Sequence, residues 1–505
     1  MAISGCIAVA AALSLTAARA GTIDLWFDDS WVALSQRAPL SRALHMGVGA
    51  PGFTVVMRWW LGLTNSSIPW AQSFALVPLL FTPFVIFVAA RIAGASRAAA
   101  TLVACLCALS PMLITESARV KQYTWEYAFS AVLLAIAAVV RRDGITMRWT
   151  ILAACSCVVA VLFSFAMLMP TALLSLVLTV ALVHEARAGE HRFDLRRIAA
   201  PLAVLAGAGL VVALWAAALL PADPPPALRA HWRIGFLGSE GSLTYTARQS
   251  VLLARGFWNA FVFRGSTAVL LVPVAILLWF AVRRWRTAWW LLTAPLLAIA
   301  LSALEVYPLG SIVQARVDAW LIPWIAVTLA LAVTDLFRVP RVRAALERVP
   351  QPARIAGLGV VLVLLSVGVT MDAKGYPRTR AERAVAALVR SERAGERTFL
   401  AWNDWPVELL LPGPIRIVDD RDSDSQFSVV RDRQPRTLHA EDRDLAAREL
   451  RTACGHTATI VGVTKESLAA ILPSVRCRSQ IVGATTNDTG LPHDDVITVS
   501  FGGRR

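Results

Sequence analysis

An adjacent pair of carboxylates, Asp28 and Asp29, follows the first apolar block of the chain, with aromatic neighbours at Trp26, Phe27 and Trp31. A positioned carboxylate can accept a proton from a hydroxyl group, which is general-base chemistry. Tryptophan and phenylalanine favour the boundary between lipid and water, so we expect the pair at a membrane interface. A solvated loop with an aromatic belt explains an arbitrary Asp-Asp pair equally well.

A second group of charged and aromatic residues opens a later apolar block at 124–140. Glu116, Arg119 and Tyr123 follow the i, i+3, i+7 spacing that places residues on one helical face, and Lys121 lies among them. Cations at the end of a membrane-spanning helix are well placed to bind the phosphate of a lipid. Long cationic side chains that reach back to the lipid–water boundary explain the same residues without a ligand.

A third group precedes the apolar block at 317–336. Tyr307 begins a Tyr-Pro-Leu-Gly run and Arg316 follows it. Proline and glycine favour turns, so the run by itself indicates only a turn. Arg316 can pair with Asp318 or Glu305, or it can meet lipid headgroups.

The composition indicates what kind of fold carries these three groups of residues. Hydrophobic residues make up 57% of the 505 residues and charged residues only 16%, and the mean hydropathy is +0.59. A soluble domain usually has about 25% charged residues, so much of this surface must face lipid. The net charge is +15, but the cations lie largely in short loops between apolar blocks and no nucleic-acid-binding motif accompanies them. Nucleic acid is therefore excluded as a partner.

We expect an all-α polytopic membrane part with about eleven transmembrane helices, because each apolar block approaches the ~20 residues that span a bilayer. The blocks are 3–22, 70–93, 98–115, 124–140, 149–168, 170–187, 200–220, 267–283, 287–304, 317–336 and 355–371. Residues 1–20 also resemble a signal peptide, but no Lys or Arg precedes the apolar run, which favours a retained helix.

Clusters of arginine on alternate loops predict the orientation. They fall within 91–97, 141–148, 187–197, 283–286 and 338–354. The positive-inside rule places such loops in the cytosol. The loops between them, which carry all three groups of candidate residues, and the C-terminal tail are then outside. We therefore expect a multi-pass protein of the cell inner (plasma) membrane with an extracytoplasmic C-terminal domain.

The tail changes character at Asp372, because it is rich in Arg, Asp and Glu. Helical patterns alternate there with β-rich runs at 398–402, 415–418, 457–463, 481–484 and 496–501. This alternation predicts a small α/β domain, so we expect a transmembrane domain over 1–371 and a soluble extracytoplasmic domain over 372–505. Outside the cytosol, Cys454 and Cys477 could form a disulfide.

The acidic pair and the outer segment 47–53 resemble the signature of the GT-C superfamily of membrane glycosyltransferases. The nearest branches are the protein O-mannosyltransferase-like and lipid A aminoarabinose-transferase-like enzymes. The run 118–123 is similar to an Arg-x-x-Lys-x-Tyr pattern of some bacterial members, and 307–316 resembles their late Tyr-Pro…Arg segment. The resemblance covers roughly 1–340 and leaves the tail without a specific match.

Two positions depart from the family pattern. Asp29 stands where the family often has glutamate, which shortens the reach of the carboxylate. His45 begins a His-Met-Gly run where relatives often have His-Pro or Asn-Gln. Both departures bear on the sugar and the acceptor more than on the class of reaction.

The resemblance implies a hexosyl- or pentosyltransferase that moves a sugar from a polyprenyl-phosphate donor to a glycan or lipid acceptor of the cell envelope, with inversion. Asp28 is then the general base and Asp29 a second carboxylate. The donor phosphate is assigned to Arg119, Lys121, Tyr123 and Arg316, and substrate contacts to Glu116, His45 and Tyr307. No metal or other cofactor is required, because no nucleotide diphosphate needs neutralising.

Other classes of function use similar helices. A transporter or lipid flippase usually places ionisable groups near the middle of the membrane, whereas these apolar blocks are nearly free of charge. A polymerase of the O-antigen ligase kind typically has a large late outer loop, for which 221–266 is available. A non-catalytic scaffold that displays the tail is the third alternative.

Overall fold

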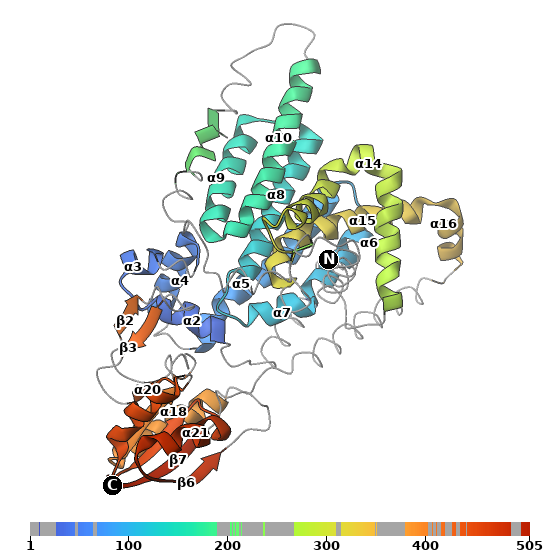
Figure 1. Cartoon of the computed structure of the whole chain (residues 1–505). Coiled ribbons are helices and arrows are strands. Elements are labelled where there is room, and N and C mark those ends of the chain that lie inside the picture. Colours follow the sequence, from blue (N-terminus) through green and yellow to red (C-terminus); the bar gives the residue numbers. More distant parts are fainter. Residues whose placement is uncertain are drawn as a thin grey trace. The chain divides into compact units, whose positions relative to one another are not determined.

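The chain divides into two compact units (Figure 1). The first comprises Met1–Gly21 with Gly49–Lys374, and the second comprises Thr22–Val48 with Gly375–Arg505. The computed structural model describes residues 10, 27–45, 49–63, 68–188, 203–204, 206–207, 209–211, 214, 236–237, 267–309, 315–348, 350, 379–401, 407, 411, 416–419, 427–430, 435–440, 442–485 and 496–504. The expected boundary at 371/372 lies outside these residues.

Every regular element in the described part of the first unit is a helix. Its elements are α4 (Pro51–Leu63), α5 (Ile68–Ile92), α6 (Arg97–Ala108), α7 (Pro111–Ser117), α8 (Tyr123–Asp143), α9 (Met147–Phe163), η1 (Phe165–Met167), α10 (Leu168–Ala188), α14 (Thr267–Ala303), η3 (Ala315–Leu321), α15 (Ile322–Arg338) and α16 (Pro340–Glu347). Among the described residues, five stretches are long and apolar enough to cross a membrane: Trp70–Ile92, Tyr123–Asp143, Phe165–His184, Val274–Ala303 and Asp318–Arg338.

These spans support a multi-pass membrane protein, but the expected eleven helices are not confirmed. The blocks 3–22, 200–220 and 355–371 lie largely outside the described residues. The block 98–115 forms two helices, because Pro111 is the first residue of α7. Proline is favoured at this position, where the backbone N–H that it lacks would have no partner within the helix. The blocks 267–283 and 287–304 form the single 37-residue helix α14, because neither glycine nor proline interrupts the run between them.

Helix α8 is the centre of the first unit. It packs against α5, α9, α10, α15 and η3, and Tyr127 and Leu134 on it are fully buried. A polar contact crosses this apolar core, because Ser130 Oγ accepts a hydrogen bond from Trp324 Nε1 at 3.0 Å and donates one to the Trp320 carbonyl at 2.6 Å. Hydroxyl groups of this kind join helices where no water competes. Ser130 therefore fixes η3 and α15 to α8.

The second unit contains a five-stranded mixed sheet in the order β4-β1-β5-β7-β6. Its strands are β1 (Arg397–Ala401), β4 (Arg436–Leu438), β5 (Thr457–Val461), β6 (Cys477–Thr485) and β7 (Val496–Arg504). Strand β1 pairs in parallel with β4 and β5, whereas β7 pairs antiparallel with β5 and β6. A separate antiparallel pair is formed by β2 (Arg416–Asp419) and β3 (Phe427–Val430).

Short helices complete the second unit. They are α2 (Phe27–Ser35), α3 (Leu40–His45), α18 (Thr379–Arg393), α20 (Arg443–Leu450), η4 (Arg451–Ala453), α21 (Lys465–Ile471) and η5 (Leu472–Val475). Phe399, Ile460 and Ile497 of the sheet pack with Leu450 and Leu468 of the helices in one apolar core. The small α/β fold expected for the tail is therefore present.

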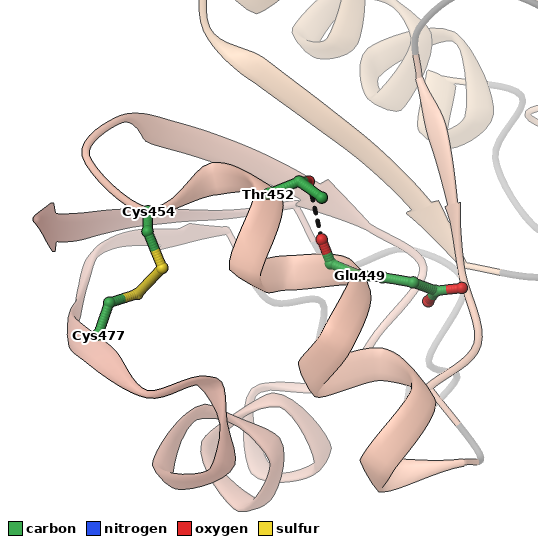
Figure 2. The surroundings of a disulfide bond; sticks show 4 residues. All are labelled: Glu449, Thr452, Cys454 and Cys477. Carbon is green, nitrogen blue, oxygen red and sulfur yellow. Dashed lines mark hydrogen bonds between the residues drawn. A yellow bond between two sulfur atoms is a disulfide. The ribbon is translucent and has the colours of Figure 1, made fainter. Parts of the chain in front are cut away.

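A disulfide closes the part of the tail that leads into β6. Cys454, just after η4, is bonded to Cys477, the first residue of β6, and their Cα atoms are 6.1 Å apart (Figure 2). Figure 2 also shows Thr452 Oγ1 donating a hydrogen bond of 2.8 Å to the Glu449 carbonyl, which stabilises the last turn before Cys454. The disulfide thereby ties the start of an edge strand to the end of the α20–η4 segment.

Candidate active site

Charged side chains are buried where α7 ends and α8 begins. Glu116 lies in the last turn of α7, and its Oε1 is 3.7 Å from Arg119 Nε. The side chains of Glu116 and Arg119 are 6% and 15% exposed, and Lys121 is 7% exposed. Burial of cations costs free energy unless anions compensate them. This burial does not fit cations that simply extend into water.

Hydrogen bonds at both ends fix the connection that carries these residues. Ser110 caps the start of α7 by accepting a hydrogen bond from the Leu113 amide. At the start of α8, Thr124 Oγ1 donates to the Ala75 carbonyl at 2.8 Å, and Trp125 Nε1 donates to the Phe74 carbonyl at 3.2 Å. The segment 118–122 is therefore held between α7 and a helix start that is anchored on α5.

Two further carboxyl groups approach the same place, one from the first turn of α8 and one from a distant part of the chain. Glu126, in the first turn of α8, is 2% exposed and accepts a hydrogen bond of 2.5 Å from Ser164 Oγ. Asp318, in η3, is 1% exposed, and within the described part of the chain neither of its carboxylate oxygens has a hydrogen-bond donor. Glu126 interacts electrostatically with both Glu116 and Asp318. The elements α7, α8 and η3 thus bring three acidic side chains together.

Two tyrosines border this group. Tyr307 interacts electrostatically with Asp318, Glu126 and Tyr123, and both tyrosines pack against the apolar core around α8. Desolvation, followed by the nearby Asp318 and Glu126 carboxylates, raises the pKa of the Tyr307 hydroxyl well above its usual value. The phenol therefore keeps its proton and remains a hydrogen-bond donor near neutral pH.

The structure brings some of the sequence-predicted residues together and assigns others to a different unit. Glu116, Arg119, Lys121, Tyr123 and Tyr307 all belong to the first unit. The backbone of Arg316 lies in η3, but its side chain is outside the described residues.

The acidic pair belongs to the second unit. Asp28 and Asp29 lie in helix α2 instead of the expected loop, and Asp29 is 1% exposed. His45 is the last residue of α3. The side chains of Asp28 and His45 are outside the described residues. The assignment of Asp28 as a base therefore stays a prediction.

Sequence reasoning gave no catalytic or binding role to Glu126 or Asp318, and it considered Asp318 only as a partner of Arg316. The available signal was the presence of an acidic residue within a stretch apolar enough to span a membrane, because such residues are rare unless they have a partner or a function. Among the described residues, no three His, Cys, Asp or Glu side chains are arranged to hold a metal ion. The three carboxylates thus influence one another electrostatically without forming a ligand set.

Comparisons with known proteins give similarity at the level of structure. No protein-family model matches the sequence, and no curated protein matches it by sequence. ArnT from Cupriavidus metallidurans in the apo state superposes with a TM-score of 0.57 at 13% identity, over 99% of this chain and 98% of that chain. The same protein bound to undecaprenyl phosphate gives a TM-score of 0.53 at 13% identity, over 98% and 97%.

A further match is the Archaeoglobus fulgidus oligosaccharyltransferase in complex with zinc and sulfate. Its TM-score is 0.45 at 14% identity, and the alignment covers 80% of this chain. The chain spans only 61% of the length of that protein.

Proposed function

Starting from the GT-C fold that this chain has, we propose that it is a membrane glycosyltransferase that takes its sugar from a polyprenyl-phosphate donor. The observation that carries the proposal is the match to ArnT over almost the whole of both chains, with the tail included. The solved ArnT complex contains undecaprenyl phosphate, which supports a lipid phosphate of this class as the donor carrier here. The acceptor is a glycan or lipid of the cell envelope.

The donor phosphate is assigned to Arg119, Lys121, Tyr123 and Arg316. A polyprenyl phosphate keeps its chain in lipid and its charge at the boundary, so its site must combine apolar helices with cations near a helix end. Arg119 and Lys121 meet this requirement, because they are largely buried at the start of α8. The 3.7 Å separation of Arg119 from Glu116 is too long for a strong hydrogen bond, so a phosphate can replace the carboxylate as the partner of the guanidinium.

Asp28 is assigned as the general base that takes the proton of the acceptor hydroxyl, and Asp29 is the second carboxylate. The acceptor oxygen attacks the anomeric carbon of the sugar as Asp28 takes the hydroxyl proton. The bond between that carbon and the phosphate oxygen breaks, and the polyprenyl phosphate leaves with the bonding electrons. A single displacement of this kind inverts the anomeric centre. Glu116, His45 and Tyr307 are the proposed contacts to the sugar and acceptor.

The proposed location is a bacterial inner membrane with the tail on the outer side. The arginine clusters at 91–97, 141–148, 187–197 and 338–354 support this orientation. The cluster at 283–286 does not, because it lies inside helix α14 and not in the expected cytosolic loop. The cysteine pair of the tail also supports the orientation, because stable disulfides belong to oxidising compartments.

The test is mass spectrometry of lipid that copurifies with the full-length chain, followed by incubation with radiolabelled polyprenyl-phosphate sugars. We expect a polyprenyl phosphate or its glycoside in the extract, and a labelled product whose new glycosidic bond withstands mild acid that cleaves the donor. Absence of both from a folded preparation, judged by a cooperative unfolding transition, overturns the proposal.

One observation favours a second function, namely a transporter of lipid-linked glycans. Glu126 and Asp318 are buried in the first turns of stretches apolar enough to span a membrane, and transporters use buried acidic residues along substrate paths. Movement of labelled donor across liposomes without a new glycosidic bond is the outcome that identifies a transporter.

A further inference from the structure

A hollow of about 670 Å³ lies on the second unit where η5 meets the edge strand β6. Its polar lining includes Arg476, Arg478, Ser479, Gln480 and Ser500, and we call these residues the arginine pocket. Its volume lies within the range of small-molecule sites, roughly 300–1,000 Å³. A single inorganic anion needs far less space.

No described residue of the tail neutralises the cations of the arginine pocket. Arg476 and Arg478 are exposed, and within the described residues neither guanidinium has an ion-pair or hydrogen-bond partner. Both residues line the same hollow. The planar guanidinium groups of the two arginines can each donate two hydrogen bonds to a phosphate or carboxylate.

The backbone holds one of these arginines in an unusual conformation. Arg476 has φ of +61°, in the left-handed region that residues with a Cβ rarely adopt. The next residue, Cys477, is fixed by the disulfide to Cys454 and by pairing with Arg504 of β7. The backbone that carries the Arg476 side chain is thus restrained before any ligand binds, which removes the backbone part of the entropic cost of binding.

The remaining polar groups suit hydroxyl-rich ligands. Ser479 and Ser500 offer hydroxyls, and Gln480 offers both a carbonyl oxygen and an amide. Sugars present alternating donors and acceptors of the same kind. We propose that the arginine pocket binds an anionic saccharide, in which the two arginines hold a phosphate or carboxylate and the polar residues hold ring hydroxyls. The choice of a saccharide rests on the proposed function, since a glycan acceptor would reach the tail.

The test is isothermal titration calorimetry on the full-length chain in detergent micelles. The probes are mannose 6-phosphate and glucuronate, with mannose and inorganic phosphate as the matched partial ligands. We expect both anionic sugars to bind more tightly than either partial ligand. Arg478→Gln should weaken their binding about tenfold to a hundredfold, because a charge-assisted hydrogen bond contributes on this scale.

Two further variants separate binding from folding. Arg476→Gly removes a cation and replaces it with the residue that tolerates positive φ, so the unfolding temperature should hold or rise while binding weakens. Arg393→Gln removes an exposed arginine from the last turn of α18, away from the pocket lining. This control variant should bind mannose 6-phosphate and glucuronate with the same affinities as the wild-type protein.

Three outcomes overturn the proposal. They are equal affinity for inorganic phosphate and mannose 6-phosphate, unchanged binding in both pocket variants, and arginine-dependent binding to phosphatidylglycerol vesicles without any sugar binding. The last outcome identifies a membrane-docking surface instead. Since this assay needs no sugar transfer, its failure is distinguishable from failure of the proposed reaction.

Discussion

At the scale of single residues, the start of α8 combines features that are costly to bury. Glu116, Arg119 and Lys121 lie there within a helical membrane unit. The buried carboxyl group of Glu126 interacts electrostatically with Glu116, and that of Asp318 with Glu126. Charges in such surroundings are retained when they pair or when a ligand uses them. In the proposed function, the donor phosphate is the ligand that the cations bind.

The first prediction concerns the proposed base. Asp28→Asn keeps the shape of the side chain but removes its ability to accept a proton, so transfer should fall by about 10²–10⁴-fold. Copurified donor lipid should stay at the wild-type level, because the phosphate contacts are untouched. Rates are measured with labelled donor in liposomes. Near-normal transfer by folded Asp28→Asn and Asp29→Asn proteins contradicts the assignment.

The second prediction concerns the phosphate contacts. Lys121→Ala and Arg316→Ala each remove a proposed charge-assisted partner, so donor retention should fall about tenfold to a hundredfold. Retention is measured as polyprenyl phosphate per protein by mass spectrometry. Arg148→Ala is the matched control, since Arg148 is an exposed arginine on an expected cytosolic loop. Equal retention in all three variants rules out these contacts.

At the scale of elements, η3 determines where Asp318 lies. Its attachment to α8 runs through Ser130, which bonds both the Trp320 carbonyl and the Trp324 indole. All three residues are buried, so each of these hydrogen bonds lacks competition from water. The position of the candidate site therefore depends on a hydroxyl that is remote from the proposed chemistry.

The third prediction tests this attachment. Ser130→Ala leaves the buried Trp324 indole without an acceptor, which should lower the free energy of unfolding by about 1–3 kcal/mol. The readout is thermal unfolding in detergent. Thr179→Ala in α10 is the control, since that exposed hydroxyl bonds only to the preceding helical turn. A Ser130→Ala protein as stable as the control shows that the contact does not hold η3.

At the scale of the whole molecule, a membrane unit and a mixed α/β unit are built from one chain. The five apolar spans identify the first as multi-pass. The proposed chemistry requires the outer loops and the tail to share one compartment, so topology and disulfide formation are linked expectations.

The fourth prediction is the topology itself. Single cysteines introduced at Arg192 and Gly502, in a background without native cysteines, should label differently with a membrane-impermeant maleimide on intact cells. Gly502 should react from outside, whereas Arg192 should react only after permeabilisation. Labelling of Gly502 only after permeabilisation places the tail in the cytosol and removes all three candidate groups from the outer face.

The fifth prediction is that Cys454 and Cys477 are oxidised in protein purified without reductant. Their sequence separation of 23 residues corresponds to about 3 kcal/mol of stabilisation in the loop-entropy model. Non-reduced peptide mapping should find the linked peptides, and Cys477→Ser should lower the unfolding temperature. Free thiols at both positions in native protein would refute the pairing.

Local signals in the sequence determined much of the fold. Long uncharged runs predicted α5, α8 and α10 because a lipid-facing helix needs little beyond sustained apolarity. The β-rich runs predicted β1, β5 and β7, whose buried residues are mostly apolar. The short strands β3 and β4 were not predicted, whereas β2, also four residues long, was predicted by the run at 415–418.

Only the tertiary structure decided which charged residues meet. Glu116 and Tyr123 are close in sequence, and their spacing predicted one helical face. That prediction was wrong, because α7 ends at Ser117 and α8 begins only at Tyr123. The approach of Asp318 to Glu126 depends on η3 packing against α8, and the hydrogen bond from Ser164 depends on the break between α9 and η1. The sequence by itself therefore determined the helices and their apolar faces. The charge balance of the site followed from packing between distant segments, because electrostatic interaction acts through space and not along the chain.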